Sequence, residues 1–194
     1  MRFENTKTFG NLAKAFAGES QARNRYVFSA SVAKKEGYQA IGFTFIQTAE
    51  NEQEHAKVFY KLLAKYAPAS DIIHVDADYP LEYGDTLANL KAAAAGEREE
   101  WEVIYSDFGD IAEKEGFPEI AIAFKTIATV ENHHYLRYKE LAQAVENGTL
   151  FHKDSPTSWK CTNCGYVHEG TEAPGVCPAC IHPQGFFIDL PQNY

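Results

Sequence analysis

The sequence predicts a mainly α-helical protein, in which a four-helix bundle with one long crossover precedes a small metal-bound domain. Three observations carry this prediction. Four long stretches place apolar residues at helical spacing, an internal repeat relates the first two stretches to the last two, and all four cysteines lie between residues 161 and 180. The helical stretches account for the bundle, and the cysteines account for the small domain.

The composition excludes several classes of protein. The chain has 194 residues with 18 basic and 27 acidic side chains, a formal net charge of −9, which gives no support to nucleic-acid binding. Residues 1–7 lack the apolar core of a signal peptide, and no apolar run approaches the ~18 residues of a membrane span. The cysteines form two C-x-x-C pairs and leave none for a disulfide, as in a reducing compartment. We therefore expect a cytoplasmic protein without membrane contact.

Each of the four stretches has the 3.6-residue period of an amphipathic helix. Gly37 and Gly116 are expected to end the first and third helices, and Pro118 suits the first turn of the fourth. The helices therefore pair into two hairpins. Residues 67–83 contain two prolines and are too long for a tight turn, so they are expected to form the long crossover. The expected helices cover residues 9–30, 41–66, 87–111 and 120–145.

The two hairpins are copies of one pattern at an offset of 79 residues. The matched pairs are Glu52 with Glu131, His55 with His134, and Tyr26 with Tyr105. Glu19 matches Glu97 at an offset of 78, so the second half holds one extra residue between Glu97 and Tyr105. A single inserted residue in a continuous helix usually forms a π-bulge, often at a functional site. We expect a π-bulge there.

The motif Glu-x-x-His occurs once in each half, inside an apolar helical stripe. Buried carboxylates are stable only when they are paired or bound to metal, and such motifs with one further glutamate per half are typical of dinuclear iron or manganese centres. Oxygen and imidazole ligands suit these metals, and iron fits redox chemistry best. Glu100 has no counterpart, because Ala22 holds the matching position. The expected ligands are Glu19, Glu52, His55, Glu97, Glu100, Glu131 and His134.

Two tyrosines lie one or two turns beyond the glutamates of the first and third helices. The phenol groups of Tyr26 and Tyr105 are placed where they can donate hydrogen bonds to ligand carboxylates. The alternative is that both are plain core tyrosines. Four other polar residues fall off the ligand stripe and are expected to be solvated: Glu50, Glu54, Glu99 and His133.

The C-terminal part is expected to depend on its metal. Four thiolates in two C-x-x-C pairs make a closed tetrahedral site, which fits zinc or iron, and the stretch is too short to bury a stable core unaided. We expect a bundle at residues 1–148, a linker at 149–158 and the small domain at 159–194. Its expected core is Trp159, Tyr166, Phe186 and Phe187. The expected ligands are Cys161, Cys164, Cys177 and Cys180.

The whole chain resembles rubrerythrin, a family that joins a ferritin-like di-iron domain to a rubredoxin-like domain. The resemblance rests on motifs that match in order and spacing. They are Ala17-Gly-Glu-Ser-Gln-Ala-Arg-Asn-Arg-Tyr26, Glu52-Gln-Glu-His55-Ala-Lys57, Ala95-Gly-Glu-x-x-Glu100, Glu131-x-x-His134 and Trp159-x-Cys-x-x-Cys-Gly-Tyr-Val-His-Glu-Gly170.

The resemblance implies roles for the individual ligands. Glu52 and Glu131 would bridge two irons, with Glu19 on one iron and Glu97 and His134 on the other. In the family one iron moves on reduction from a carboxylate to a histidine, and the matching residues here are Glu100 and His55. The residues expected to take part in catalysis are Glu100, His55, Tyr26 and Tyr105.

The resemblance also implies a function in oxidative-stress defence. The expected activity is a peroxidase that reduces hydrogen peroxide to water, with electrons from rubredoxin or an NADH-dependent reductase passing through a third iron at the cysteines. A head-to-tail homodimer is expected. A ferroxidase, an iron-handling protein or an oxygen-reducing di-iron protein is the alternative, and zinc is the alternative at the cysteine site.

Overall fold

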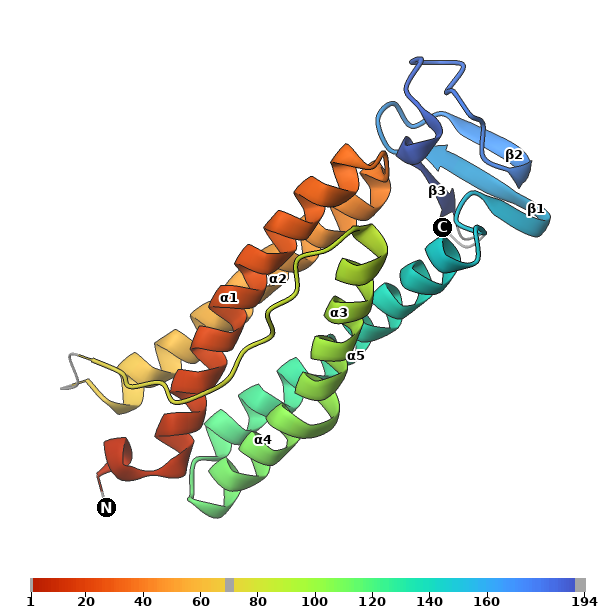
Figure 1. Cartoon of the computed structure of the whole chain (residues 1–194). Helices are drawn as coiled ribbons and strands as arrows, with labels where there is room; N and C mark the ends of the chain where they lie inside the picture. The colour runs from red at the N-terminus through yellow and green to blue at the C-terminus, as the bar shows by residue number, and fades with distance from the viewer. Residues whose placement is uncertain (1, 69–71, 191–194) are drawn as a thin grey trace.

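Long helices form most of the chain (Figure 1). The computed structural model describes residues 2–68 and 72–190. Thr6 caps the first helix by accepting a hydrogen bond from the backbone NH of Phe9, which satisfies one of its free amide groups. The helical elements are η1 (Phe3–Asn5), α1 (Lys7–Lys35), α2 (Gln39–Tyr66), α3 (Thr86–Glu99), η2 (Glu100–Ile104), α4 (Tyr105–Lys114) and α5 (Pro118–Glu146).

Two glycines end helices where the sequence predicted. Gly37 follows α1 with a φ of 91°, and Gly116 follows α4 with a φ of 86°. Glycine adopts this left-handed conformation without the steric cost of a Cβ atom. The α1–α2 hairpin and the hairpin of α3, η2, α4 and α5 are therefore confirmed, with Pro118 in the first turn of α5.

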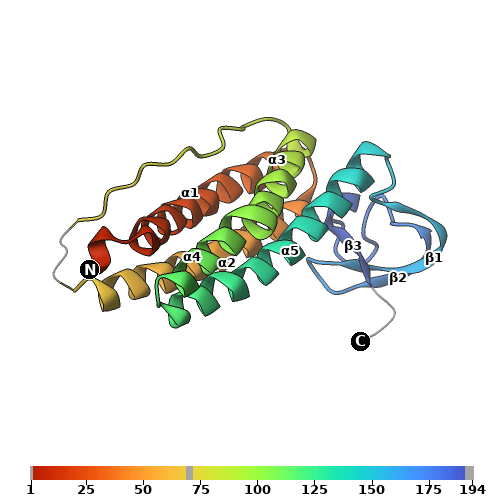
Figure 2. The same cartoon turned by 90° about the horizontal axis from the view of Figure 1, so that it is seen from below.

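The π-bulge is confirmed as well. The π-helix η2 interrupts the third long helix between α3 and α4, within the segment between Glu97 and Tyr105. All three pieces continue in one direction beside α5 (Figures 1 and 2). The extra residue is thus absorbed inside the helix without a break in the bundle.

The crossover between α2 and α3 follows the outside of α1 (Figures 1 and 2). Its expected bounds, residues 67–83, include residues 69–71, which lie outside the described part of the chain. At its end Asp85 caps α3 by accepting from the NH of Ala88, and the NH of Thr86 donates to Glu36 at 3.0 Å. The crossover therefore ends at the α1–α2 turn.

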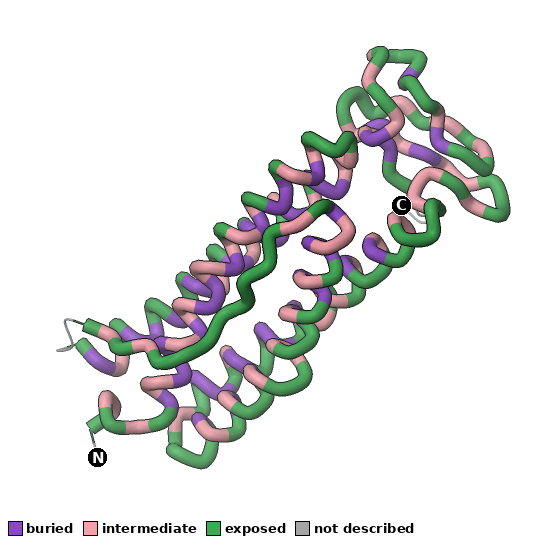
Figure 3. Tube along the Cα trace, viewed as in Figure 1, coloured by how far each residue is buried: buried purple, intermediate pink, exposed green. Residues whose placement is uncertain are grey.

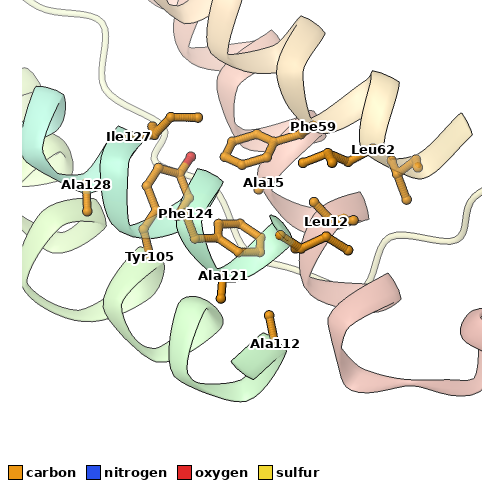
Figure 4. Packing of buried hydrophobic residues seen from close by; sticks show 12 residues of the cluster. Leu12, Ala15, Phe59, Leu62, Tyr105, Ala112, Ala121, Phe124, Ile127 and Ala128 are labelled. Atoms are coloured by element: carbon orange, nitrogen blue, oxygen red, sulfur yellow. The ribbon is translucent and has the colours of Figure 1, made fainter. Parts of the chain in front are cut away.

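Buried positions recur along the long helices (Figure 3). Their apolar side chains form two clusters in the bundle. In the cluster of Figure 4, the rings of Phe59 and Phe124 lie 5.0 Å apart beside Leu12. The other cluster contains Phe45 and Tyr138, with ring centroids 5.1 Å apart. Each fully buried ring or aliphatic chain contributes ~1.5–3 kcal/mol. These clusters occupy the bundle on either side of its polar centre.

The small domain is a three-stranded antiparallel sheet in the order β2-β1-β3. Its expected core is confirmed, since Trp159 and Phe187 are buried and Tyr166 and Phe186 pack against them. Most of the expected linker is strand instead, because its backbone groups pair with β2 and β3 although its side chains are polar. The elements are β1 (His152–Cys161), β2 (Val167–Glu172), η3 (Gln184–Phe186) and β3 (Phe187–Leu190).

The small domain lies at the end of the bundle (Figures 1 and 2). Gly185 of η3 is buried against the α1–α2 turn, where an added Cβ would lie 1.7 Å from the carbonyl oxygen of Gly37. Only glycine fits such an approach of two backbones. No helix in the described part of the chain is long and apolar enough to cross a membrane.

Candidate metal centres

Four glutamates from four helices converge at the centre of the bundle. Glu19 of α1, Glu52 of α2, Glu97 of α3 and Glu131 of α5 are each at most 1% exposed. Glu52 and Glu131 are followed three residues later by His55 and His134, one helical turn along the same faces. The helical period thus directs every one of these polar groups into the core.

The six side chains form two overlapping groups whose ligand atoms lie within 4.8 Å of one another. One group adds Glu19 and His55 to a shared pair of glutamates, and the other adds Glu97 and His134. The shared pair is Glu52 and Glu131. This arrangement provides two adjacent positions for cations, and Glu52 and Glu131 belong to both.

Each histidine lies between carboxylates. His55 Nδ1 is 2.9 Å from oxygens of both Glu52 and Glu131. His134 Nδ1 is 2.8 Å from Glu131, 3.2 Å from Glu52 and 3.5 Å from Glu97. Burial opposes the charged imidazoles, but these carboxylates outweigh it and raise the pKa of His55 to about 9 and that of His134 to about 12.

The carboxylates need more positive charge than two imidazoles supply. Burial, and next the charge of Glu52, raise the pKa of Glu19 and Glu97. Apart from these close imidazoles, at least one side-chain oxygen of each of the four glutamates has no hydrogen-bond partner among the described residues. Unpartnered buried carboxylates are strongly destabilising unless cations bind them. The residues present therefore fit two metal ions.

The two tyrosines donate hydrogen bonds to the glutamates. The Tyr105 hydroxyl donates to Glu19 Oε1 at 2.5 Å, and the Tyr26 hydroxyl donates to Glu97 Oε1. Each bond crosses from one hairpin to the other, so neither tyrosine bonds the glutamate of its own helix. The repeat in the sequence identified both tyrosines. Only the packing of the two hairpins determines that each tyrosine bonds the glutamate of the other hairpin.

Glu100 lies beside the cage, where the charges of Glu97 and Glu131 act on it, but outside both ligand groups. It is the first residue of η2, belongs to neither ligand group, and lines an adjacent cavity together with Tyr105 and Arg25. Arg25, on α1, was missed by the sequence analysis. The sequence did offer a signal for Arg25. It lies three residues after Ala22, the counterpart of Glu100, and residues three apart on a helix share a face. The four off-stripe residues, Glu50, Glu54, Glu99 and His133, are exposed as expected.

The four cysteines also come together. Their sulfur atoms lie within 4.8 Å of one another, with 3.7 Å between Cys161 and Cys180 and between Cys164 and Cys177. Each C-x-x-C pair turns tightly, with a backbone bond from the NH of the next residue to the first cysteine. That next residue has positive φ in both turns: Gly165 at 81° and Ile181 at 60°.

Comparison with known proteins gives the family. The family model of rubrerythrin matches residues 10–142, and the model of its rubredoxin-like domain matches residues 159–188. The chain belongs to the rubrerythrin family. Rubrerythrin of Clostridium perfringens is 51% identical over 97% of both chains, and rubrerythrin of Nitratidesulfovibrio vulgaris is 44% identical over 97% of both.

Solved structures agree with this assignment. The fully reduced, all-ferrous state of nigerythrin matches with a TM-score of 0.64 and 29% identity over 96% of this chain and 90% of the other. A bacterioferritin of Desulfovibrio desulfuricans has a TM-score of 0.65 at 20% identity over 74% of this chain and 82% of the other, which shows the ferritin-like fold alone.

Rubrerythrins bind iron, and this chain has both candidate sites, the carboxylate and histidine cage of the bundle and the four cysteines of the rubredoxin-like domain. Membership of the family supports an iron-dependent, oxidoreductase-like function in oxidative stress. It also implies redox partners in general.

Proposed function

We propose that this rubrerythrin is a non-haem di-iron peroxidase that reduces hydrogen peroxide to water, with electrons relayed through the rubredoxin-like iron. One observation carries the proposal: two overlapping ligand groups form a paired metal site on the same chain as a four-thiolate site. A paired site suits a two-electron reaction, and the thiolate site suits one-electron transfer. Storage of iron would gain nothing from the thiolate site.

The proposed ligands follow the two groups. Glu52 and Glu131 would contribute to both metal positions, with Glu19 and His55 at one position and Glu97 and His134 at the other. We propose that Glu100 would be the alternative to His55 as a ligand at the first metal position. The four cysteines would hold the third iron. The proposed domains remain residues 1–148 and 159–194, although strand β1 begins inside the segment between them.

When bound, the iron pair supplies the two electrons that break the O–O bond. The chain then has to hold the carboxylates in place and deliver two protons. Tyr26 and Tyr105 hold Glu97 and Glu19 by hydrogen bonds, while Glu100 faces the cavity. Carboxyl and phenol groups so placed can act as proton donors. We therefore propose Glu100 and Tyr105 as the proton donors on the cavity side.

The proposed partners are rubredoxin or an NADH-dependent reductase, in the cytoplasm, where thiols stay reduced. We also propose a head-to-tail homodimer. His134 lies 13 residues before Asn147, so at ~1.5 Å per residue α5 ends ~20 Å beyond the iron pair. The rubredoxin-like domain follows at that end (Figure 2), and a partner's copy beside the bundle centre shortens the electron path.

Stopped-flow oxidation of the fully ferrous, full-length protein tests the activity. We expect hydrogen peroxide to oxidise the iron pair faster than dioxygen does, and reduced rubredoxin to restore the ferrous state. Faster oxidation by dioxygen would contradict the peroxidase and favour a ferroxidase or oxygen-reducing function. Sedimentation of the same sample tests the dimer, and full activity in an exclusively monomeric protein would exclude the proposed head-to-tail arrangement.

A further inference from the structure

A cavity of about 170 Å³ lies between α1, the α3–η2 junction and the crossover. Glu100 and the buried Tyr105 line it on the side of the ligand cage, and residues 77–80 of the crossover line it on the exposed side. The cavity therefore connects solvent to the part of the cage that contains the two proposed proton donors.

The side chain of Tyr79 forms the crossover wall of this cavity. Its hydroxyl donates to the backbone carbonyl of Lys14 at 3.0 Å. Its ring lies against Gly18, where an added Cβ would be 3.6 Å from a ring carbon. Tyr79 is thus held to α1 at two points and is only 37% exposed, so its ring limits the width of the cavity.

The cavity has a polar part and an apolar part. Arg25 and Gln21 stand on α1 near Glu100, and Arg25 Nε donates to Gln21 Oε1 at 2.6 Å. Ile104 and Phe108 line it with apolar groups. A hydroperoxide, ROOH, is divided in the same way, because its O–O group is polar and its substituent R is not.

We propose that this cavity receives the hydroperoxide and that Tyr79 sets the largest substituent R that it admits. The inference rests on the proposed peroxidase. Two electrons from the iron pair and two protons break the O–O bond of ROOH and give ROH and water, with hydrogen peroxide as the case in which R is hydrogen. The substrate class thus extends from hydrogen peroxide to small alkyl hydroperoxides.

The size limit follows from the volume. A cavity of ~150 Å³ in another protein holds one benzene molecule. The cavity here therefore has room for tert-butyl hydroperoxide. Cumene hydroperoxide carries a branched carbon and the O–O group in addition to its ring, so we expect the Tyr79 side chain to exclude it.

The test compares kcat/KM for three hydroperoxides in the iron-loaded, full-length protein. In Tyr79→Ala we expect kcat/KM for cumene hydroperoxide, divided by kcat/KM for hydrogen peroxide, to rise by about tenfold or more. Small changes in pocket volume alter substrate discrimination by about 10–200-fold. Tyr79→Phe keeps the ring and should keep the wild-type ratio. Tyr83→Ala changes an exposed tyrosine of the same crossover outside this cavity and serves as the matched control.

A binding measurement gives a second readout that does not depend on turnover. Cumyl alcohol, the product of cumene hydroperoxide, should bind more tightly to Tyr79→Ala than to the wild type in calorimetric titration. Tyr79→Leu should shift both readouts less but in the same direction. Unchanged discrimination in Tyr79→Ala, with normal turnover of hydrogen peroxide, would overturn this inference alone. Absence of hydrogen peroxide turnover in the wild type would instead overturn the proposed function.

Discussion

At the scale of single residues, the cage of the bundle is symmetric except at Glu100. Ala22 occupies the corresponding place after Glu19 and is buried, whereas Glu100 lies outside both ligand groups and faces the cavity. The six symmetric side chains are sufficient for two metal positions. The additional carboxylate, Glu100, is therefore free to exchange with His55 as a ligand and to deliver protons.

Replacing Glu100 with glutamine tests this division. We expect Glu100→Gln to retain iron but to lower peroxide turnover on the order of 10²-fold, the usual contribution of a positioned proton donor. Single-turnover kinetics and iron analysis provide the measurement. Glu102→Gln, on the exposed side of the same π-helix, is the matched control, and equal turnover in both variants would remove Glu100 from the mechanism.

The ionisable groups of the cage predict how the metal-free protein responds to pH. The pKa of His55 rises from 6.5 to about 9 on folding, and those of Glu19 and Glu97 also rise. The folded state therefore binds more protons than the unfolded state. The contribution of His55 to stability is fully present below pH 6.5 and is lost as the pH rises through about 9, while that of the two glutamates begins to be lost above pH 4.5.

Thermal unfolding at pH 6.5 and pH 9 measures this effect. We expect a lower Tm at pH 9 for the metal-free protein. The iron-loaded protein should lose less stability over the same range, because metal replaces the protons on the ligands. A metal-free protein that becomes more stable at pH 9 would contradict these pKa shifts.

At the scale of the element, the π-helix η2 distinguishes the second half from the first. Glu97 and Tyr105 both face the cage although the spacing between them is one residue longer than between Glu19 and Tyr26. The wider turn of η2 places the Glu100 side chain beside the cage. At the matching position of α1, where the helix is regular, the buried side chain is Ala22. The bulge thus makes room for the additional carboxylate.

Deleting Val103, which is half exposed within η2, should restore the spacing of the first half. We expect the shortened protein to retain its iron ligands but to lose ~1–3 kcal/mol of stability, because Glu100 is forced into a tightly packed position. Adding Glu100→Ala to the deletion should restore the stability without restoring peroxide turnover. Denaturant unfolding and turnover assays give both values, and a deletion without any cost would show that the bulge is not needed for Glu100.

At the scale of the whole molecule, the rubredoxin-like domain is positioned by a contact of two glycines. Gly185 of η3 meets the backbone carbonyl of Gly37 in the α1–α2 turn, and no side chain can be added at Gly185 without moving one backbone. The thiolate site thereby has a defined place at the end of the bundle.

Replacing Gly185 with alanine should separate the two domains. We expect faster amide hydrogen exchange in the α1–α2 turn and a larger radius of gyration, with iron content unchanged. Gly175→Ala, in the same domain but with open space at its Cβ, should leave both at their wild-type values. A compact Gly185→Ala protein with unchanged exchange would show that other contacts hold the domain.

The sequence by itself determined the helices, the two hairpins, the π-bulge, and the six cage residues and four cysteines that come together, but not the place of Glu100 outside the ligand groups or the part of Arg25. These follow from local rules: the 3.6-residue period, glycine at positive φ, the repeat offset and the spacing of the cysteines. The strand in the expected linker was missed, because residues 152–158 have polar side chains and their pairing depends on strands that come later in the chain.

Only the tertiary structure decided the relations between segments that are distant in sequence. The exchange of Tyr26 and Tyr105 between hairpins, the cavity beneath Tyr79 and the contact of Gly185 with the α1–α2 turn all depend on how packed elements approach one another. Side-chain period fixes which face of a helix is buried, but it does not fix the neighbour that the face meets.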